Sequence, residues 1–154
     1  MDMMFASPAF DNDAVVPRRY TCGGEDVSPP FKWQGAPEGT KSFALTCHDP
    51  DAPSGTFFHW AIFDIPSSQL QLAERLPRME TFADGTKQAV NDFGRIGYAG
   101  PCPPKGHGIH HYHFRLFALD VDHLDLDKAD CRQVQVALQA HILAFTEIVG
   151  RFQR

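Results

Sequence analysis

The sequence has 154 residues, of which 43% are hydrophobic and 21% charged, and its formal net charge is −5 at pH 7. These values are typical of a globular protein, and the length fits one domain, residues 1–154, that is large enough to bury a core. The chain has no basic stretch and no apolar run of about 20 residues, so neither nucleic acid binding nor an integral membrane protein is expected.

The N-terminal segment and the cysteines both bear on the expected location. MDMMFASPAFDND has neither the basic start nor the apolar core of a signal peptide, so we expect a cytoplasmic protein. The cysteines match no zinc-binding spacing, and a chain of this size in a reducing compartment is expected to keep them as thiols. Cys47 falls in an apolar strand pattern, whereas Cys102 lies between two prolines and is the candidate for reactivity.

Two segments in the first half of the chain show strand patterns. Residues 41–49 alternate, and one face is expected to carry Phe43, Leu45, Cys47 and Asp49. Residues 58–66 are apolar on both faces, as in a central strand. One side of this second strand is expected to carry His59, Ala61, Phe63 and Ile65, and the other Trp60 and Ile62.

Residues 109–120 form a third alternating segment. One face is expected to carry His110, Tyr112, Phe114, Leu116 and Ala118. The opposite face is expected to carry His111, His113 and Arg115. This alternation separates the histidines of HGIHHYHF, so the segment is not expected to bind a metal ion.

The C-terminal segment changes to a helical period. Apolar residues recur at helical spacing at Val134, Leu138, Ile142, Phe145, Val149 and Phe152. Asp130 and Gln133 before them resemble a capping box. We therefore expect a mainly β protein of antiparallel sheets, closed by an amphipathic C-terminal helix over residues 134–152.

A polar side chain is expected at one end of the apolar face of each of the three predicted strands. Asp49 ends the first face, His59 begins the second, and His110 and Tyr112 begin the third. Asp51, two residues beyond Asp49, is expected to point the same way in an extended chain. If the strands are neighbours, these five residues line one pocket; otherwise each is a polar residue where a strand meets water.

The loop before the third strand, GYAGPCPPKGHG (residues 97–108), is rich in glycine and proline. Prolines fix the backbone and glycines allow it to approach a ligand closely, and free N–H groups in such a turn can hold an anion. A rigid connecting loop without a ligand would have the same composition.

Several of these motifs resemble those of one family. DPDAPSG followed by HW, GPCPP followed by GIHHYHF, and the stretch VVPRRYTCGGEDVSPPFKW are similar to the phosphatidylethanolamine-binding proteins. AVNDFGRIGYAGPCPP and HILAFTEIVGRF resemble in particular the bacterial Raf kinase inhibitor-like (YbhB/YbcL) branch. The resemblance extends from about residue 10 to residue 150.

The resemblance implies an antiparallel β-sandwich with peripheral helices and a small pocket that binds phosphate or a phosphorylated head group. The positions that match the pocket of the family are Asp49, Asp51, Pro53, His59, Gly100, Pro103, His110 and Tyr112. Two residues depart from the family pattern: His111 stands where an arginine is common, and Asp64 where many relatives have asparagine. Both are expected on the faces opposite the pocket, so the pocket should be preserved.

The expected function is the binding of a small phosphorylated or other anionic ligand, with no cofactor, no metal ion and no enzymatic activity. Charged histidines held by Asp49 or Asp51 would face the anion, or a protonated carboxyl group would donate to it. One alternative is a regulator that inhibits a kinase or protease through protein contacts. Another is a hydrolase that uses the Asp and His side chains. A homodimer is an ordinary further expectation.

Overall fold

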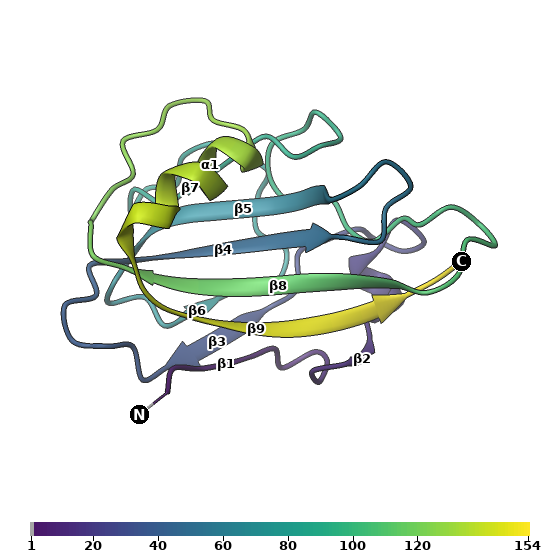
Figure 1. The fold of residues 1–154 in the computed structure, drawn as a ribbon, viewed down its shortest axis with the longest axis horizontal. Coiled ribbons are helices and arrows are strands. Elements are labelled where there is room, and N and C mark those ends of the chain that lie inside the picture. The colour runs from purple at the N-terminus through teal and green to yellow at the C-terminus, as the bar shows by residue number, and fades with distance from the viewer. Residues whose placement is uncertain (1) are drawn as a thin grey trace.

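The computed structural model describes residues 2–154 and contains two β-sheets packed against each other (Figure 1). The larger sheet has the strand order β2-β9-β8-β4-β5-β7 and the smaller one β1-β3-β6. The long strands of the larger sheet are β4 (Ser42–Asp49), β5 (Phe57–Pro66), β8 (His110–Leu119) and β9 (Ile142–Phe152). The short strands are β1 (Met4–Ala6), β2 (Ala14–Val15), β3 (Phe31–Gln34), β6 (Gln71–Leu72) and β7 (Lys87–Gln88).

The prediction of a mainly β protein is confirmed, and most strand pairs are antiparallel as expected. The exception is β2, which pairs in parallel with β9. No helix within residues 2–154 has the length and apolar character needed to cross a bilayer.

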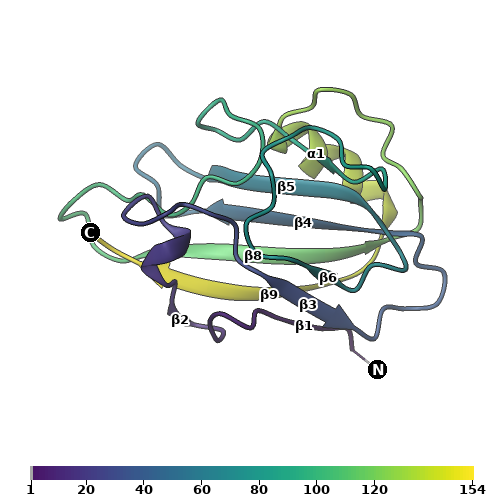
Figure 2. The ribbon, with the colours of Figure 1, turned by 180° about the vertical axis from the view of Figure 1, so that it is seen from behind.

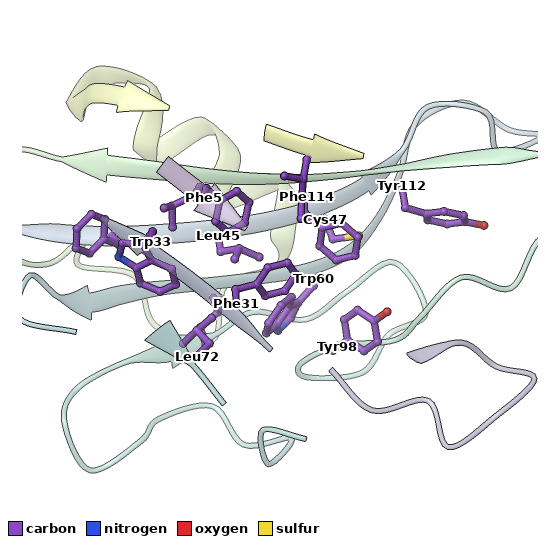
Figure 3. Packing of buried hydrophobic residues seen from close by; sticks show 14 of the residues in the cluster. Phe5, Phe31, Trp33, Leu45, Cys47, Trp60, Leu72, Tyr98, Tyr112 and Phe114 are labelled. Atoms are coloured by element: carbon purple, nitrogen blue, oxygen red, sulfur yellow. The ribbon is translucent and has the colours of Figure 1, made fainter. Parts of the chain in front are cut away.

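An aromatic core fills the space between the two sheets (Figure 3). Phe31 of β3 lies 5.3 Å from Phe5 of β1 and 5.2 Å from Phe114 of β8, measured between ring centroids. The predicted inward faces of residues 41–49 and 109–120 are confirmed, because Leu45 and Cys47 belong to this core with Phe114. Buried aromatic side chains contribute most of the stabilising apolar area in such a core.

The opposite face of the larger sheet packs against the helix α1 (Cys131–Leu138). Val134 and Leu138 of α1 contact a second apolar cluster that includes Ala44, Phe63 and Phe117 of the sheet. Figures 1 and 2 show α1 on one side of the larger sheet and the small strands β1, β3 and β6 on the other. The central strands are therefore buried on both faces, as their apolar sequences require.

The predicted C-terminal helix is too long. The capping box of Asp130 and Gln133 is present, but α1 ends at Leu138, and the short 3-10 helix η2 (Gln139–His141) follows it. Residues 142–152 form β9, which pairs antiparallel with β8 from His110 to Leu119. The helical spacing in this segment was misleading because its β-branched and aromatic residues also suit a strand, and the long edge of β8 is available for pairing.

A β-bulge changes the predicted faces of β5. Cys47 pairs with Trp60 while the next residue of β4, His48, pairs with Phe58, so His59 is an extra residue on β5. The expected common face of His59, Ala61, Phe63 and Ile65 is therefore wrong. Ala61 and Phe63 face α1, and a second register shift, between the pairs Phe43–Ile65 and Leu45–Ile62, turns Ile65 to the other sheet with Trp60 and Ile62. The bulge directs His59 to the pocket side.

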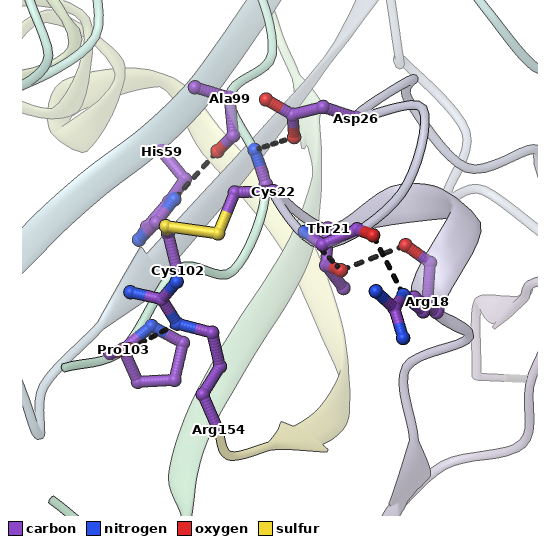
Figure 4. Close-up of a disulfide and its surroundings, with 11 residues drawn as sticks. Arg18, Thr21, Cys22, Asp26, His59, Ala99, Cys102, Pro103 and Arg154 are labelled. Carbon is purple, nitrogen blue, oxygen red and sulfur yellow. Dashed lines mark hydrogen bonds between the residues drawn. A yellow bond between two sulfur atoms is a disulfide. The ribbon is translucent and has the colours of Figure 1, made fainter. Parts of the chain in front are cut away.

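The expectation of four free thiols is also wrong. Cys22, after the short 3-10 helix η1 (Arg18–Tyr20), forms a disulfide with Cys102 (Figure 4). Cys47 and Cys131 are buried free cysteines. Their burial raises the pKa of both thiols.

Gly150 offers a test of the packing between β9 and the N-terminal segment. A Cβ atom at this position would lie 2.3 Å from Cγ2 of the buried Val16. We expect Gly150→Ala to lower the free energy of unfolding by about 1–3 kcal/mol because the side chains must shift to relieve the overlap. Urea denaturation would measure this loss. Gly23→Ala is the control, since its Cβ would approach no atom closer than 3.4 Å, and equal losses in the two variants would contradict the packing argument.

Candidate functional site

A cavity of about 240 Å³ opens where β4 ends and β5 and β8 begin. Its polar lining comes from these strands: Asp49 from β4, His59 from β5, and His110 and Tyr112 from β8. Loop residues complete the wall, namely Ala52, Pro53, Ser54, Phe93, Cys102, Pro103 and Pro104, together with Phe57 at the start of β5. Six of the eight predicted site residues therefore meet in one cavity.

Asp49 is the buried anchor of the site, with 3% of its surface exposed. One carboxylate oxygen, Oδ1, accepts a hydrogen bond of 2.7 Å from the backbone N–H of Asp51. The other, Oδ2, lies 2.6 Å from Nδ1 of His110, which donates to it. Both oxygens thus have a donor, as a buried carboxylate requires.

His110 connects Asp49 to the surface through a second imidazole. Its Nε2 lies 2.6 Å from Nδ1 of His107, a residue of the exposed loop before β8. One hydrogen lies between these two nitrogens. The result is a continuous chain of carboxylate, imidazole and imidazole from the interior to solvent.

His59 has a fixed tautomer. Its Nδ1 lies 2.6 Å from the carbonyl oxygen of Ala99 (Figure 4), and because a carbonyl can only accept, Nδ1 carries the hydrogen. Burial lowers the pKa of His59, against the opposing effect of the Ala99 carbonyl. The imidazole is therefore neutral at pH 7, and its Nε2 has an unprotonated lone pair.

Tyr112 contributes a hydroxyl group that has no hydrogen-bond partner among the described residues 2–154. Its ring packs edge-on against His59 with 5.3 Å between centroids. Figure 3 shows its hydroxyl oxygen pointing away from the apolar core. Burial, and then the charge of Asp49, raises the pKa of Tyr112, so the hydroxyl keeps its proton and is a donor. A buried donor without a partner is costly in a folded protein, and such groups mark ligand sites.

Aromatic side chains form the rim of the cavity. Phe57 and Phe93 are in edge-to-face contact at 4.7 Å, and Phe93 lies 5.5 Å from His59. Sequence reasoning did not identify either phenylalanine as a site residue. Phe93 lies in a loop far from the recognised strands, and Phe57 gave no signal beyond its position at the start of the strand that contains His59.

Two predicted site residues lie outside the cavity lining. Asp51 turns outward and accepts hydrogen bonds of 2.8 Å from both the backbone N–H and Nδ1 of His111. Partial burial raises the pKa of Asp51, but the bonds from His111 outweigh this effect and lower it. Gly100 donates its N–H to Asp26, so it does not supply the free anion donor expected there, and a Cβ atom would lie 2.0 Å from the Tyr20 carbonyl oxygen.

The two departures from the family pattern lie away from the cavity, as expected. His111 faces outward with Asp51, and Asp64 accepts from the backbone N–H of Leu124. Burial raises the pKa of Asp64.

His113 also points away from the pocket, and its ring stacks on that of His48 with 5.0 Å between centroids. Within residues 2–154 no group of three or more His, Cys, Asp or Glu side chains could hold a metal ion.

The fold and this site define a two-sheet protein with a small polar pocket at one end of its central strands. The model of the phosphatidylethanolamine-binding protein family matches residues 6–153 of the chain. A UPF0098 protein of Aquifex aeolicus is 48% identical over 149 residues, which is 96% of this chain and 86% of the relative. The UPF0098 protein YbhB of Escherichia coli is 38% identical and covers 84% of this chain and 83% of its own.

A solved structure agrees with these sequence relatives. The crystal structure of Escherichia coli YbcL, described as a new member of the mammalian PEBP family, superposes with a TM-score of 0.90 at 32% identity, over 100% of this chain and 99% of YbcL. The chain belongs to the phosphatidylethanolamine-binding protein family, and within it to the branch of YbcL and YbhB. The resemblance inferred from the sequence motifs is confirmed.

The unpartnered hydroxyl of Tyr112 predicts an unusual response to mutation. Because Tyr112→Phe removes a buried polar group that forms no internal hydrogen bond, we expect the free energy of unfolding to rise by about 1 kcal/mol. Tyr98→Phe is the matched control, since the Tyr98 hydroxyl donates to the Tyr20 carbonyl at 2.6 Å. Its loss should cost about 1 kcal/mol in the same urea denaturation experiment. Equal destabilisation by the two substitutions would show that Tyr112 is satisfied within the protein.

Proposed function

We propose that the cavity binds a small anionic ligand, such as phosphate or a phosphorylated head group. The observation that carries this proposal is the buried Tyr112 hydroxyl, a donor without a partner in residues 2–154, beside the histidine pair anchored by Asp49. An anion in the cavity would accept from this hydroxyl and from a protonated imidazole, and hydrogen bonds to charged groups are the stronger kind.

The carboxylate of Asp49 is compatible with an anion in the same cavity. Its charge is compensated by the hydrogen bonds that it accepts from the Asp51 N–H and from Nδ1 of His110. For a zwitterionic ligand such as phosphoethanolamine, the ammonium group would lie near the carboxylate of Asp49. The volume of about 240 Å³ suits a head group and lies below the usual range for larger ligands.

Binding is favoured over catalysis by the partners of the two cavity histidines. A hydrolase of the covalent type pairs a base with the hydroxyl or thiol group that it activates. His110 uses Nδ1 for Asp49 and Nε2 for His107, and within residues 2–154 no hydroxyl or thiol group is hydrogen-bonded to the free Nε2 of His59. We therefore propose a binding protein rather than an enzyme. A kinase or other protein partner, a homodimer and a cytoplasmic location stay predictions.

The proposal is tested by the pH dependence of anion binding. Sulfate is a suitable probe because its charge is constant between pH 5.5 and 8. An anion favours protonated imidazoles, so binding takes up protons, and we expect the affinity to rise about tenfold as the pH falls from about 8 to about 5.5. NMR titration would measure the dissociation constant at each pH. An affinity that is the same across this range would contradict the proposal.

Two variants sharpen this experiment. Tyr112→Phe removes a charge-assisted hydrogen bond and should weaken sulfate binding about tenfold or more at every pH, without loss of stability. Asp64→Asn is the control, because Asp64 lies outside the cavity lining and should leave the affinity unchanged. The pH range of the experiment has a lower limit. Because the pKa of His59 is lowered in the folded protein, the unfolded chain binds more protons than the folded protein below about pH 6.5. The free energy of unfolding therefore falls as the pH is lowered through this range.

A further inference from the structure

The disulfide forms part of the cavity wall. Cys102 lines the cavity beside Pro103, and its partner Cys22 belongs to the segment that follows η1. Figure 4 shows the bridge close to His59 and Arg154. Cys102 is therefore both a wall residue of the anion site and half of a covalent link to a segment 80 residues away in the sequence. This inference rests on the proposed function.

The wall segment, Pro101-Cys102-Pro103-Pro104, can donate few backbone hydrogen bonds. Three of its four residues are prolines, which have no backbone N–H to donate. Its carbonyl groups accept three hydrogen bonds: Pro101 from the N–H of Cys22 at 3.1 Å, Pro103 from Nε of Arg154 at 2.7 Å, and Pro104 from the N–H of His107 at 3.1 Å. The first of these bonds joins the same two segments as the disulfide, which adds the covalent link between them.

The segment on the other side of the bridge is held independently of the disulfide. The Tyr98 hydroxyl donates to the Tyr20 carbonyl at 2.6 Å, and Gly100 N–H donates to Asp26 at 2.7 Å. These bonds persist when the sulfurs separate, so the two cysteines stay near each other in the reduced protein. Opening of the bridge is therefore local and reversible rather than an unfolding event.

The bridge is partly exposed, and an arginine is bonded to the loop on each side of it. Arg18 donates from Nε to the carbonyl oxygen of Gly23, at 2.7 Å, and Arg154 donates in the same way to Pro103. Each arginine is thus bonded to the residue directly after one of the two cysteines. Positive charge in the surroundings of a disulfide favours the thiolate that leaves when the bridge is attacked. Both cysteines are partly exposed, unlike the buried Cys47 and Cys131.

We propose that the Cys22–Cys102 disulfide is a redox switch for the anion pocket. A thiolate of a dithiol reductant attacks one sulfur, the S–S bond breaks, and a mixed disulfide and one cysteine thiolate form. The second thiol of the reductant then displaces the other cysteine and closes the reductant's own disulfide. Two electrons and two protons have passed to the protein. The wall at residues 101–104 loses its covalent link, and the affinity for the anion falls.

The test compares sulfate binding by the oxidised protein and by the protein reduced with dithiothreitol, at one pH and by NMR titration. We expect reduction to weaken binding at least fivefold, and reoxidation to restore it. The double variant Cys22→Ser/Cys102→Ser should bind like the reduced protein. Adding dithiothreitol to this variant is the matched control and should change nothing, because its remaining cysteines are the buried Cys47 and Cys131.

The outcomes separate this inference from the proposed function. If the oxidised protein binds sulfate and the reduced protein binds it within twofold, the switch is wrong and the anion pocket stands. A bridge that dithiothreitol cannot reduce in the folded protein would likewise overturn the switch. If the oxidised protein does not bind sulfate, the proposed function fails and the switch fails with it.

Discussion

The hydrogen bond between Asp49 and His110 is the interaction on which the site depends. It joins the end of β4 to the start of β8 at a point where both side chains are almost fully buried. A carboxylate in such a place is tolerated only if it is paired, and removing one partner of a buried pair typically costs about 3–5 kcal/mol. The pair therefore holds the imidazole of His110 in one orientation, with its other ring nitrogen directed to the exposed His107.

The apolar core and the polar site lie on the same sheet face and support each other. Cys47 and Phe114 belong to the core between the sheets, and the residues two positions further toward the pocket, Asp49 and Tyr112, line the cavity. Because strand residues alternate in direction, these polar side chains are presented by rigid strands rather than by loops. Phe57, Phe93 and the proline-rich wall complete the lining of the cavity.

Sequence reasoning succeeded where alternation is regular and failed where the backbone departs from it. The inward faces of β4 and β8 could be predicted, and with them Asp49, His110 and Tyr112. The bulge at His59 could not, because an extra residue depends on pairing with β4 and leaves no mark in the pattern of β5 itself.

Long-range contacts account for the other differences between prediction and structure. β9 exists because it pairs with β8, and helical spacing alone does not reveal that partner. The bridge between Cys22 and Cys102 requires two loops to meet, which cysteine spacing cannot show.

The most direct test of the central claim is to follow the histidine ring signals by NMR while phosphoethanolamine is added. The account predicts saturable shifts at His59 and His110 and none at His141, which pairs with Asp120 at the other end of β8. Unchanged signals at His59 and His110, or equal shifts at His141, would contradict it.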